Sequence, residues 1–375
     1  MLERRSTSDS FFLRSLAPGF ATGIGVGLWL KLLAQNSCRV SPKYLGRAAA
    51  ISGMAALNSF VGALEQLRYR SAIRQARPPA PLFVLGLPRS GTTHLHNLLS
   101  QDARFAFPNT YQVMNPRIFL LTESWLAPQQ QRFLPETRPM DNVRWSMSMP
   151  AEDEFAIMGL SGLSPFGSSL FPRNHARYDR YSDFCDASPK ERQHWQQALL
   201  HFLKKLRVRD ERPLILKSPF HTTRIPLLLE MFPDARFVCI HRHPYDVYVS
   251  GIHTVRKALP VSALQRWNMD EQSRRTEEAF RILLDAYFEH RHRIPKGRLV
   301  EVEYRQVEQS PLETLRHIYD ALSLPEFATA EPAFAEYIRS LEGYRKNIFA
   351  EVDPEVKTRL QRDWRRCFEE WGYNA

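Results

Sequence analysis

Short apolar runs alternate with apolar residues at helical spacing over most of the chain. Residues 82–85 form one continuous apolar run, as expected for a strand that is buried on both faces of a parallel sheet. Leu95, Leu98 and Leu99 then recur at helical spacing. A strand followed by a helix is the repeating unit of an α/β fold.

The same order of strand and helix is predicted twice more. Residues 214–216 are apolar and lead into Lys217, and a helix is expected over 223–231. Residues 236–241 predict the next strand, and the helix after it is expected to carry Pro244 in its first turn, where a missing N–H costs no hydrogen bond. The chain is therefore predicted to form a parallel sheet flanked by helices.

The first 80 residues have a different pattern. Two stretches without charge, 15–30 and 48–64, lie among basic residues, and each is shorter than the roughly 20 apolar residues that span a bilayer. The proline-rich run at 74–81 cannot continue a helix and predicts a linker. We therefore expect a helical appendage at residues 1–80 and a main domain at residues 81–375.

Three interpretations of the appendage are open at this point. Apolar helices flanked by cations suit attachment to an anionic membrane surface. A helical hairpin packed on the main domain has the same pattern. A cleaved secretory signal is the third interpretation, and Glu3 and Asp9 disfavour it because they interrupt the segment that should be basic.

Composition narrows the class of protein. The chain has 375 residues, of which 43% are hydrophobic and 24% are charged, which is ordinary globular usage. Residues 1–80 carry 11 Lys and Arg against 3 Asp and Glu, whereas residues 81–375 carry 40 against 37. The main domain is thus nearly neutral and is not expected to bind nucleic acid. The four cysteines are far apart, so neither a zinc site nor a disulfide framework is indicated.

The turn after the first predicted strand has the composition of an anion-binding loop. Residues 86–93 read Gly-Leu-Pro-Arg-Ser-Gly-Thr-Thr and lead into a helix N-terminus, which offers free N–H groups to a phosphate. The spacing nearly matches that of nucleoside triphosphatases, but Thr92 occupies the position of their lysine. Arg89 supplies a cation instead, so a differently shaped phosphate ligand is expected.

A second motif follows the strand at 236–241. Arg242 stands at the carboxyl end of that strand, and Ser250 lies on the following helix. Ligands of open parallel sheets bind beyond the carboxyl ends of the strands. Arg242 and Ser250 are therefore expected to converge on one phosphate group.

These motifs resemble those of the sulfotransferases that use 3′-phosphoadenosine 5′-phosphosulfate (PAPS), particularly the bacterial branch and the protein-tyrosine sulfotransferases. The resemblance covers residues 82–250 clearly. It implies a P-loop-like sheet, PAPS as co-substrate, a 5′-phosphosulfate loop at residues 86–93, a 3′-phosphate site at Arg242 and Ser250, and Lys217 near the sulfuryl group. The residues that it implies for donor binding are Arg89, Ser90, Gly91, Thr92, Thr93, His94, Arg242 and Ser250.

The implied reaction transfers a sulfuryl group to a hydroxyl or amine. Arg89 and Lys217 would supply positive charge in the transition state, and no metal is required. The acceptor is expected to be a small molecule, a lipid or a glycan. The donor is made inside cells, so a cytoplasmic enzyme is predicted, held at the inner face of a membrane if the appendage binds one. The alternatives are a phosphotransferase and a protein that senses nucleotides without catalysis.

The group that takes the acceptor's proton stands at no position familiar from this family. Cytosolic members have a histidine two residues after the lysine, where this chain has Pro219. Proximity to Lys217 favours His221, because histidine is a residue type that commonly serves as a general base near neutral pH, but a histidine here also suits a helix cap. The second candidate is the acidic triplet Glu152, Asp153 and Glu154, which equally suits a helix N-terminus.

Two further segments invite interpretation. Residues 155–181 mix apolar residues, Gly and Ser without clean periodicity, which is typical either of a lid over the acceptor or of an irregular core insertion. Arg345 and Lys346 are either a basic segment that closes over the nucleotide or a solvated pair. The sequence predicts no oligomeric state.

Overall fold

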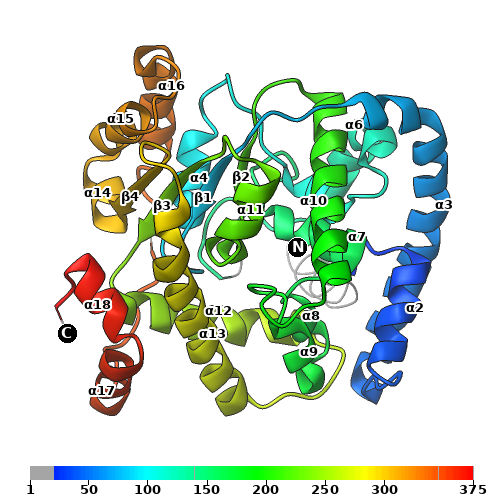
Figure 1. Ribbon diagram of the computed structural model, residues 1–375. Coiled ribbons are helices and arrows are strands. Elements are labelled where there is room, and N and C mark those ends of the chain that lie inside the picture. Colours follow the sequence, from blue (N-terminus) through cyan, green and yellow to red (C-terminus); the bar gives the residue numbers. More distant parts are fainter. Residues whose placement is uncertain (1–20, 139, 345, 375) are drawn as a thin grey trace, which may run out of the picture.

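The computed structural model describes residues 21–138, 140–344 and 346–374 (Figure 1). A four-stranded parallel sheet with the order β2-β1-β3-β4 forms its centre. The strands are β1 (Leu82–Leu85), β2 (Ile215–Lys217), β3 (Arg236–His241) and β4 (Leu299–Glu303). The three predicted strands and the α/β fold are confirmed. β4 escaped prediction because it is an edge strand whose alternate residues are half-exposed.

Successive residues of the strands face two separate cores. Leu82 and Val84 pack into the core shared with α4, α14, α15 and α16, whereas Phe83 and Leu85 pack into the core on the other side, which holds α10, α11 and α13 (Figure 1). Both faces of β1 are covered, and this explains its unbroken apolar run.

The helices that follow the strands are α4 (Thr92–Leu99), α11 (Ile225–Met231), α12 (Pro244–Ser262) and α14 (Tyr304–Gln309). Helix α11 begins two residues later than predicted, because the chain first forms a 3₁₀ turn, η4 (Pro219–Thr222), whose Phe220 N–H donates to the Ser218 hydroxyl. The other α-helices are α2 (Val26–Gln35), α3 (Leu45–Gln75), α5 (Thr110–Met114), α6 (Phe119–Gln131), α7 (Asp153–Ser161), α8 (Gly167–Leu170), α9 (Ala176–Asp179), α10 (Pro189–Arg209), α13 (Met269–His290), α15 (Pro311–Ala321), α16 (Phe327–Ser340), α17 (Pro354–Asp363) and α18 (Arg365–Trp371). The other 3₁₀ turns are η2 (Pro42–Tyr44), η3 (Pro172–Asn174) and η5 (Arg291–Arg293).

Helices α2 and α3 lie beyond α10 at the edge of the molecule (Figure 1). One face of α3 is tied to the main domain by buried polar groups. Arg47 Nη1 donates to the carbonyl of Ala263 at 2.5 Å, and Glu65 forms an ion pair with Lys205 of α10, both side chains being 2% exposed. The hairpin formed by α2 and α3 is therefore packed on the main domain. Residues 15–20 of the first uncharged stretch lie outside the described residues.

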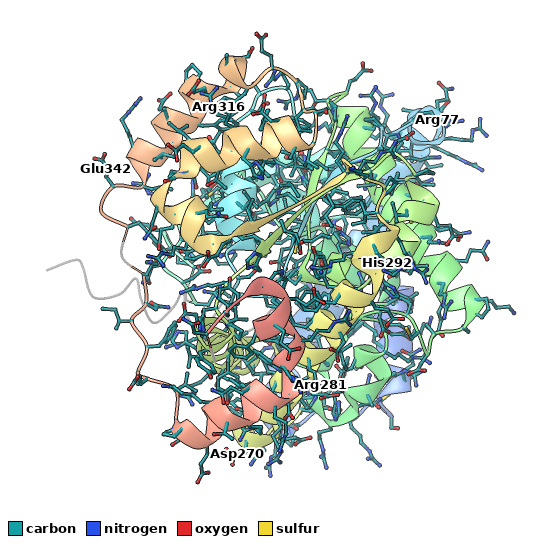
Figure 2. All side chains as sticks on the ribbon, turned by 60° about the vertical axis from the view of Figure 1, so that its left-hand side comes forward. Arg77, Asp270, Arg281, His292, Arg316 and Glu342 are labelled. Atoms are coloured by element: carbon teal, nitrogen blue, oxygen red, sulfur yellow. The ribbon has the colours of Figure 1, made fainter. Side chains whose placement is uncertain are left out.

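A long segment without helix or strand joins α16 to α17. From Glu342 it runs down the outside of the molecule (Figure 2). Tyr344 Oη donates to the carbonyl of Asp141 at 2.7 Å, and Asn347 Nδ2 donates to the carbonyl of Met140 at 3.0 Å. These bonds fasten the segment to a hairpin that stands next to the anion-binding turn.

The buried ion pair between α3 and α10 yields a stability prediction. The variant Lys205→Met leaves the Glu65 carboxylate buried without its cation, so we expect the free energy of unfolding to fall by about 3–5 kcal/mol. The double variant Glu65→Leu, Lys205→Met removes both charges and is expected to recover most of that loss. Urea denaturation measures both, with Lys190→Met at an exposed position of α10 as the control. A single variant as stable as this control would contradict the prediction.

Candidate active site

The first predicted motif forms the turn between β1 and α4, and its two glycines are required by geometry. Gly86 has φ +141° and Gly91 has φ +105°. A Cβ atom on Gly86 would lie 2.4 Å from the carbonyl oxygen of Ile240, and one on Gly91 would lie 2.3 Å from Cδ2 of Tyr304. The tight turn leads directly into the N-terminus of α4 at Thr92, where free N–H groups and the helix dipole favour an anion.

Arg89 connects the first motif to the second. Its backbone has φ +74°, an unusual conformation for a residue with a side chain. Its Nε donates to the Ser250 hydroxyl of α12 at 2.9 Å, and its Nη1 donates to Asp141 Oδ2 at 2.8 Å. The neighbouring Ser90 is buried, and its hydroxyl donates to the carbonyl of Leu87 at 2.9 Å, which holds the turn closed.

Arg242 stands at the carboxyl end of β3, beside the same turn. Its guanidinium lies 4.6 Å from the centre of the Tyr304 ring, the ring that touches Gly91, and its Nε donates to Asp246 Oδ2 at 3.1 Å. The ammonium of Lys346 lies 5.8 Å from the same ring centre and pairs with Glu308. Lys346 thus approaches the site, whereas Arg345 lies outside the described residues.

The acidic triplet at the start of α7 pairs residue by residue with the segment that follows β2. Glu152 Oε1 is 2.6 Å from Lys217 Nζ, Asp153 Oδ2 is 2.8 Å from His221 Nε2, and Glu154 Oε2 is 2.6 Å from Arg224 Nη1. Lys217, His221 and Arg224 follow one another along β2, η4 and the start of α11. Three consecutive carboxylates therefore fix the position of one cationic segment at the carboxyl end of the sheet.

Of these three pairs, only the first reaches the surface. The side chain of Glu152 is 20% exposed, whereas the Asp153, Glu154, His221 and Arg224 side chains are fully buried. Burial lowers the pKa of Lys217, and the Glu152 carboxylate opposes that shift because it stabilises the ammonium ion. Lys217 Nζ also donates to Thr93 Oγ1 at 3.4 Å, which brings the lysine next to the anion-binding turn.

The histidines near the site are buried to different degrees. His221 is enclosed between Asp153 and the ring of Phe83, 5.1 Å away. Burial would raise the pKa of Asp153, but the ion pair with His221 holds it below its ordinary value. His94 is half-buried, and its pKa is lowered by burial. Burial lowers the pKa of His96 to about 3, so this ring is neutral at physiological pH.

Sequence reasoning missed two charged residues of the site. Asp141 is buried, and it accepts hydrogen bonds from Arg89 and from Arg138. Burial would raise the pKa of Asp141, but these two guanidiniums hold it below its ordinary value. Both residues lie in an irregular stretch between α6 and α7 without a motif, so no pattern in the sequence could have linked them to Arg89.

Residues 155–181 are mostly part of the core. They form the rest of α7, then α8, η3 and α9, and Ile157, Met158, Phe171 and Tyr178 are each at most 1% exposed. Of the two interpretations of this segment, the structure therefore favours the irregular insertion over a mobile lid. Half-exposed rings occur in it as well, at Phe155 and Phe166.

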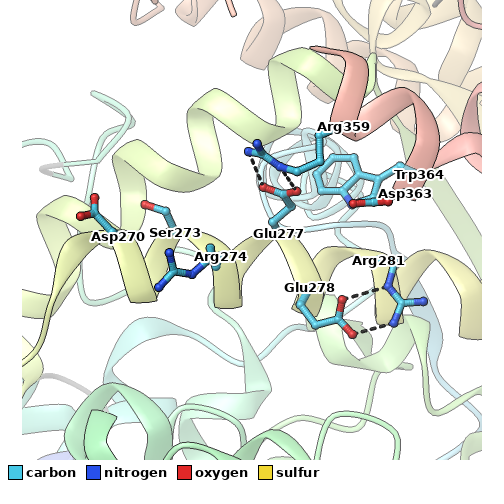
Figure 3. A pocket seen from close by; sticks show the side chains of 9 residues that line it. All are labelled: Asp270, Ser273, Arg274, Glu277, Glu278, Arg281, Arg359, Asp363 and Trp364. Atoms are coloured by element: carbon cyan, nitrogen blue, oxygen red, sulfur yellow. Dashed lines mark hydrogen bonds and ion pairs between the residues drawn. The ribbon is translucent and has the colours of Figure 1, made fainter. Parts of the chain in front are cut away.

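A cavity of about 470 Å³ lies elsewhere, between α13 and α17 (Figure 3). Four of its charged lining residues form two ion pairs, Arg359 with Glu277 and Arg281 with Glu278. Within the described residues, no group of three or more His, Cys, Asp and Glu side chains is arranged to hold a metal ion.

The fold and this site define a nucleotide-dependent transferase, with an anion-binding turn and cations gathered at the carboxyl ends of parallel strands. Residues 81–329 match the model of the sulfotransferase family. The curated omega-hydroxy-beta-dihydromenaquinone-9 sulfotransferases Stf3 of Mycobacterium bovis and Mycobacterium tuberculosis are each 30% identical over 372 residues, 99% of this chain and 95% of theirs. The chain belongs to the sulfotransferase family.

Solved structures agree in fold. Sulfotransferase STF9 from Mycobacterium avium superposes with a TM-score of 0.69 at 23% identity, over 99% of this chain and 98% of its own. Sulfotransferase STF1 from M. tuberculosis superposes with a TM-score of 0.60 at 18% identity, over 88% of both chains. The prediction of a sulfotransferase, which moves a sulfuryl group from PAPS to an acceptor, is confirmed.

Proposed function

We propose that PAPS binds between the turn at residues 86–93 and the start of α12. The contact between Arg89 Nε and Ser250 Oγ carries this proposal, because it joins two motifs that are 161 residues apart in the sequence. In this arrangement the N–H groups of the turn and of the α4 N-terminus, with Ser90, Gly91, Thr92, Thr93 and His94, surround the 5′-phosphosulfate. Arg242 and Ser250 bind the 3′-phosphate.

The reaction is a direct displacement at sulfur. The acceptor oxygen forms a bond to the sulfur, and the bond between the sulfur and the 5′-phosphate oxygen breaks and leaves its electron pair on that oxygen. Arg89 and Lys217 stabilise the negative charge that develops on the sulfuryl and phosphate oxygens. The hydroxyl proton passes to a base of the protein.

We propose Glu152 as that base instead of His221, which proximity in sequence had favoured. Glu152 is the member of the acidic triplet that is partly exposed, and its carboxylate touches Lys217. His221 is completely enclosed and already bonded to Asp153, so an acceptor hydroxyl has no access to its ring. Asp153 and Glu154 instead bind His221 and Arg224, and these two contacts keep Glu152 opposite Lys217.

The acceptor that we propose is a lipid with a hydroxyl group on a long apolar chain. The name of the 30%-identical relatives describes an acceptor of this kind, an omega-hydroxylated dihydromenaquinone. Aromatic rings beside Glu152 support the same class. Phe155, one turn further along α7, stacks on Phe166 with ring centres 4.9 Å apart, and Phe166 meets Phe220 edge to face at 5.6 Å. Such half-exposed rings suit an apolar acceptor better than a glycan.

We also propose that the enzyme works at the cytoplasmic surface of an anionic membrane, through the outward face of α3. On this face Leu57, Phe60, Leu64 and Leu67 recur at intervals of three and four residues and are 57%, 67%, 45% and 80% exposed. A stripe of that spacing covers one side of a helix. Cations flank it, with Arg39 and Lys43 before the stripe and Arg70 and Arg74 after it, as suits anionic headgroups.

The structure favours an orientation in the membrane surface over a transmembrane one. By length and composition, Pro42–Gln75 is the one helix of the described residues that qualifies as a span, and 22% of its most apolar window is buried. Its opposite face, however, is bonded to the main domain at two places, through Arg47 in the first turn and through Glu65 further along the helix. A spanning helix would draw these charged contacts into the bilayer, which costs several kcal/mol.

The proposed donor and acceptor predict the following assay result. With labelled sulfuryl donor, we expect the purified enzyme to sulfate a long-chain primary alcohol or an omega-hydroxylated quinone, and to leave glycans unlabelled. PAPS should bind far better than adenylyl sulfate, which lacks the 3′-phosphate. The variant Arg242→Ala should bind PAPS more weakly by about 1.5–3 kcal/mol, and adenylyl sulfate as the unmodified enzyme does.

Two results would contradict these assignments separately. An equal loss of affinity for both donors in Arg242→Ala would reject the 3′-phosphate site. Labelling of a glycan with none on the apolar alcohols would reject the acceptor class while leaving the donor site intact. Arg366→Ala, a half-exposed arginine of α18, removes the same charge elsewhere and serves as the control.

The proposed base predicts a different loss. Glu152→Gln keeps an oxygen for Lys217 but removes the proton acceptor, so we expect turnover to fall by roughly 100-fold or more, with little change in the affinity for the bisphosphate product. His221→Asn, compared at equal amounts of folded protein, is expected to keep most of the turnover. The reverse ranking of the two variants would make His221 the base.

The proposed membrane surface predicts a loss of vesicle binding. Phe60→Glu with Leu64→Glu should lower binding to phosphatidylglycerol-containing vesicles by at least about 100-fold, because two large apolar side chains no longer enter the interface. Sedimentation measures the binding, and Ile348→Glu, which replaces a residue 98% exposed far from α3 in sequence, is the control. Point variants are needed because deletion of α3 would remove Glu65 from Lys205. Unmodified enzyme that ignores such vesicles at low salt would reject the proposal.

A further inference from the structure

Arg138 lies on a hairpin that also carries the carboxylate partner of Arg89. In this hairpin, which comprises residues 136–138 and 140–145 of the described chain, the Trp145 N–H donates to the carbonyl of Glu136 at 2.8 Å, and the Arg138 N–H donates to the carbonyl of Val143 at 2.8 Å. The C-terminal segment holds the tip through the bonds from Tyr344 and Asn347 described above. The hairpin is therefore fixed on two sides, and its charged residues have defined positions beside the anion-binding turn.

One carboxylate in this hairpin serves two guanidiniums. Asp141 Oδ2 accepts from Arg89 Nη1 at 2.8 Å and from Arg138 Nη2 at 2.5 Å, and Asp141 Oδ1 accepts from Arg138 Nε at 3.0 Å. The Asp141 side chain is 9% exposed, and the arginine side chains are 19% and 22% exposed. Among the described residues, the bonds of Arg138 to Asp141 engage Nε and Nη2, so Nη1 is available to a ligand.

The charged side chains around the proposed place of sulfuryl transfer, which we call the transfer centre, do not sum to zero. Arg89, Arg138 and Lys217 face the carboxylates of Asp141 and Glu152, which leaves one positive charge in a largely enclosed group. An uncompensated charge is costly away from water. The excess is explained if an anionic ligand completes the group, and Arg138 is the cation of this group to which the sequence analysis gave no role.

Arg138 also lies close enough to Lys217 for its charge to act on that lysine. After burial, which is the largest cause, and the opposing effect of Glu152, the positive charge of Arg138 further lowers the pKa of Lys217. The charge of Arg138 therefore acts on Lys217, the lysine that is assigned to the sulfuryl group. Arg138 is also joined to Arg89 through Asp141.

We infer that Arg138 is a third cation of the transfer centre that binds the sulfuryl oxygens of the donor, and that Asp141 is its positioning residue. This inference rests on the proposed function. In the reaction Arg138 stabilises the charge of the sulfuryl group during displacement, as a preorganised donor does. Asp141 holds Arg89 and Arg138 at one place and competes with the donor for the same guanidiniums.

The test compares PAPS with its product, the 3′,5′-bisphosphate, which lacks the sulfuryl group. In Arg138→Ala we expect turnover to fall by about 100-fold or more and the affinity for PAPS to fall by at least about tenfold. The affinity for the bisphosphate should stay within about threefold, since its contacts remain. Arg144→Ala removes an exposed arginine from the same hairpin and should change none of the three.

The variant Asp141→Asn tests whether Asp141 positions Arg138 or only supports the structure of the hairpin. We expect it to bind the bisphosphate about three- to tenfold more tightly, because a competing anion is gone, and yet to turn over at least about tenfold more slowly, because Arg138 loses its anchor. If Asp141 only supported the structure, the Asp141→Asn variant would lose both bisphosphate affinity and turnover.

The outcomes are distinguishable. If Arg138→Ala loses PAPS and bisphosphate affinity equally, or behaves like Arg144→Ala, the inference is wrong and the proposed function stands. If the unmodified enzyme binds neither nucleotide, the proposed function fails and the inference fails with it.

Discussion

The site depends on three side-chain pairs that join consecutive carboxylates at the start of α7 to basic residues spaced along the segment from β2 to the start of α11. Glu152, Asp153 and Glu154 meet Lys217, His221 and Arg224 in the same order. Removing one partner of a buried pair leaves the other charge buried without compensation, which is strongly destabilising, so these contacts hold the start of α7 against the segment after β2. The two enclosed pairs, Asp153–His221 and Glu154–Arg224, fix how the two segments align. The partly exposed pair, Glu152–Lys217, is thereby held in a defined position.

The pair between Glu152 and Lys217 also explains how a buried lysine with a lowered pKa can keep its positive charge. Burial alone would drive Lys217 toward the neutral form, and the Glu152 carboxylate opposes this. A carboxylate in that position stabilises the charged form of the lysine, and under the proposed function it would also accept the proton of the attacking hydroxyl. If Glu152 is the base, as proposed, one contact performs both tasks, and a histidine at the position of Pro219 is not needed.

Helix α3 has one face that binds the main domain and one face that is proposed to bind the membrane. Its buried face carries Arg47 and Glu65, which bind the main domain, and its opposite face carries the exposed apolar stripe. If the stripe lies on a bilayer, as proposed, the main domain is held beside the membrane through the Glu65–Lys205 pair and α10. A lipid acceptor would then reach the enzyme without crossing bulk water. The helices at residues 26–75 are thus part of the main core and also its outer surface.

The sequence by itself determined the strands β1, β2 and β3 and the turn with its glycines, because each of these depends on local patterns of apolar residues and glycines. Distances between segments are set only when helices pack on the sheet. The tertiary structure therefore decided that Glu152 meets Lys217, that His221 is enclosed, and that Arg138 and Asp141 join Arg89. It also decided which face of α3 is exposed, because the uncharged stretch at 48–64 is apolar on both sides of the helix, and only the position of α10 shows which side is covered.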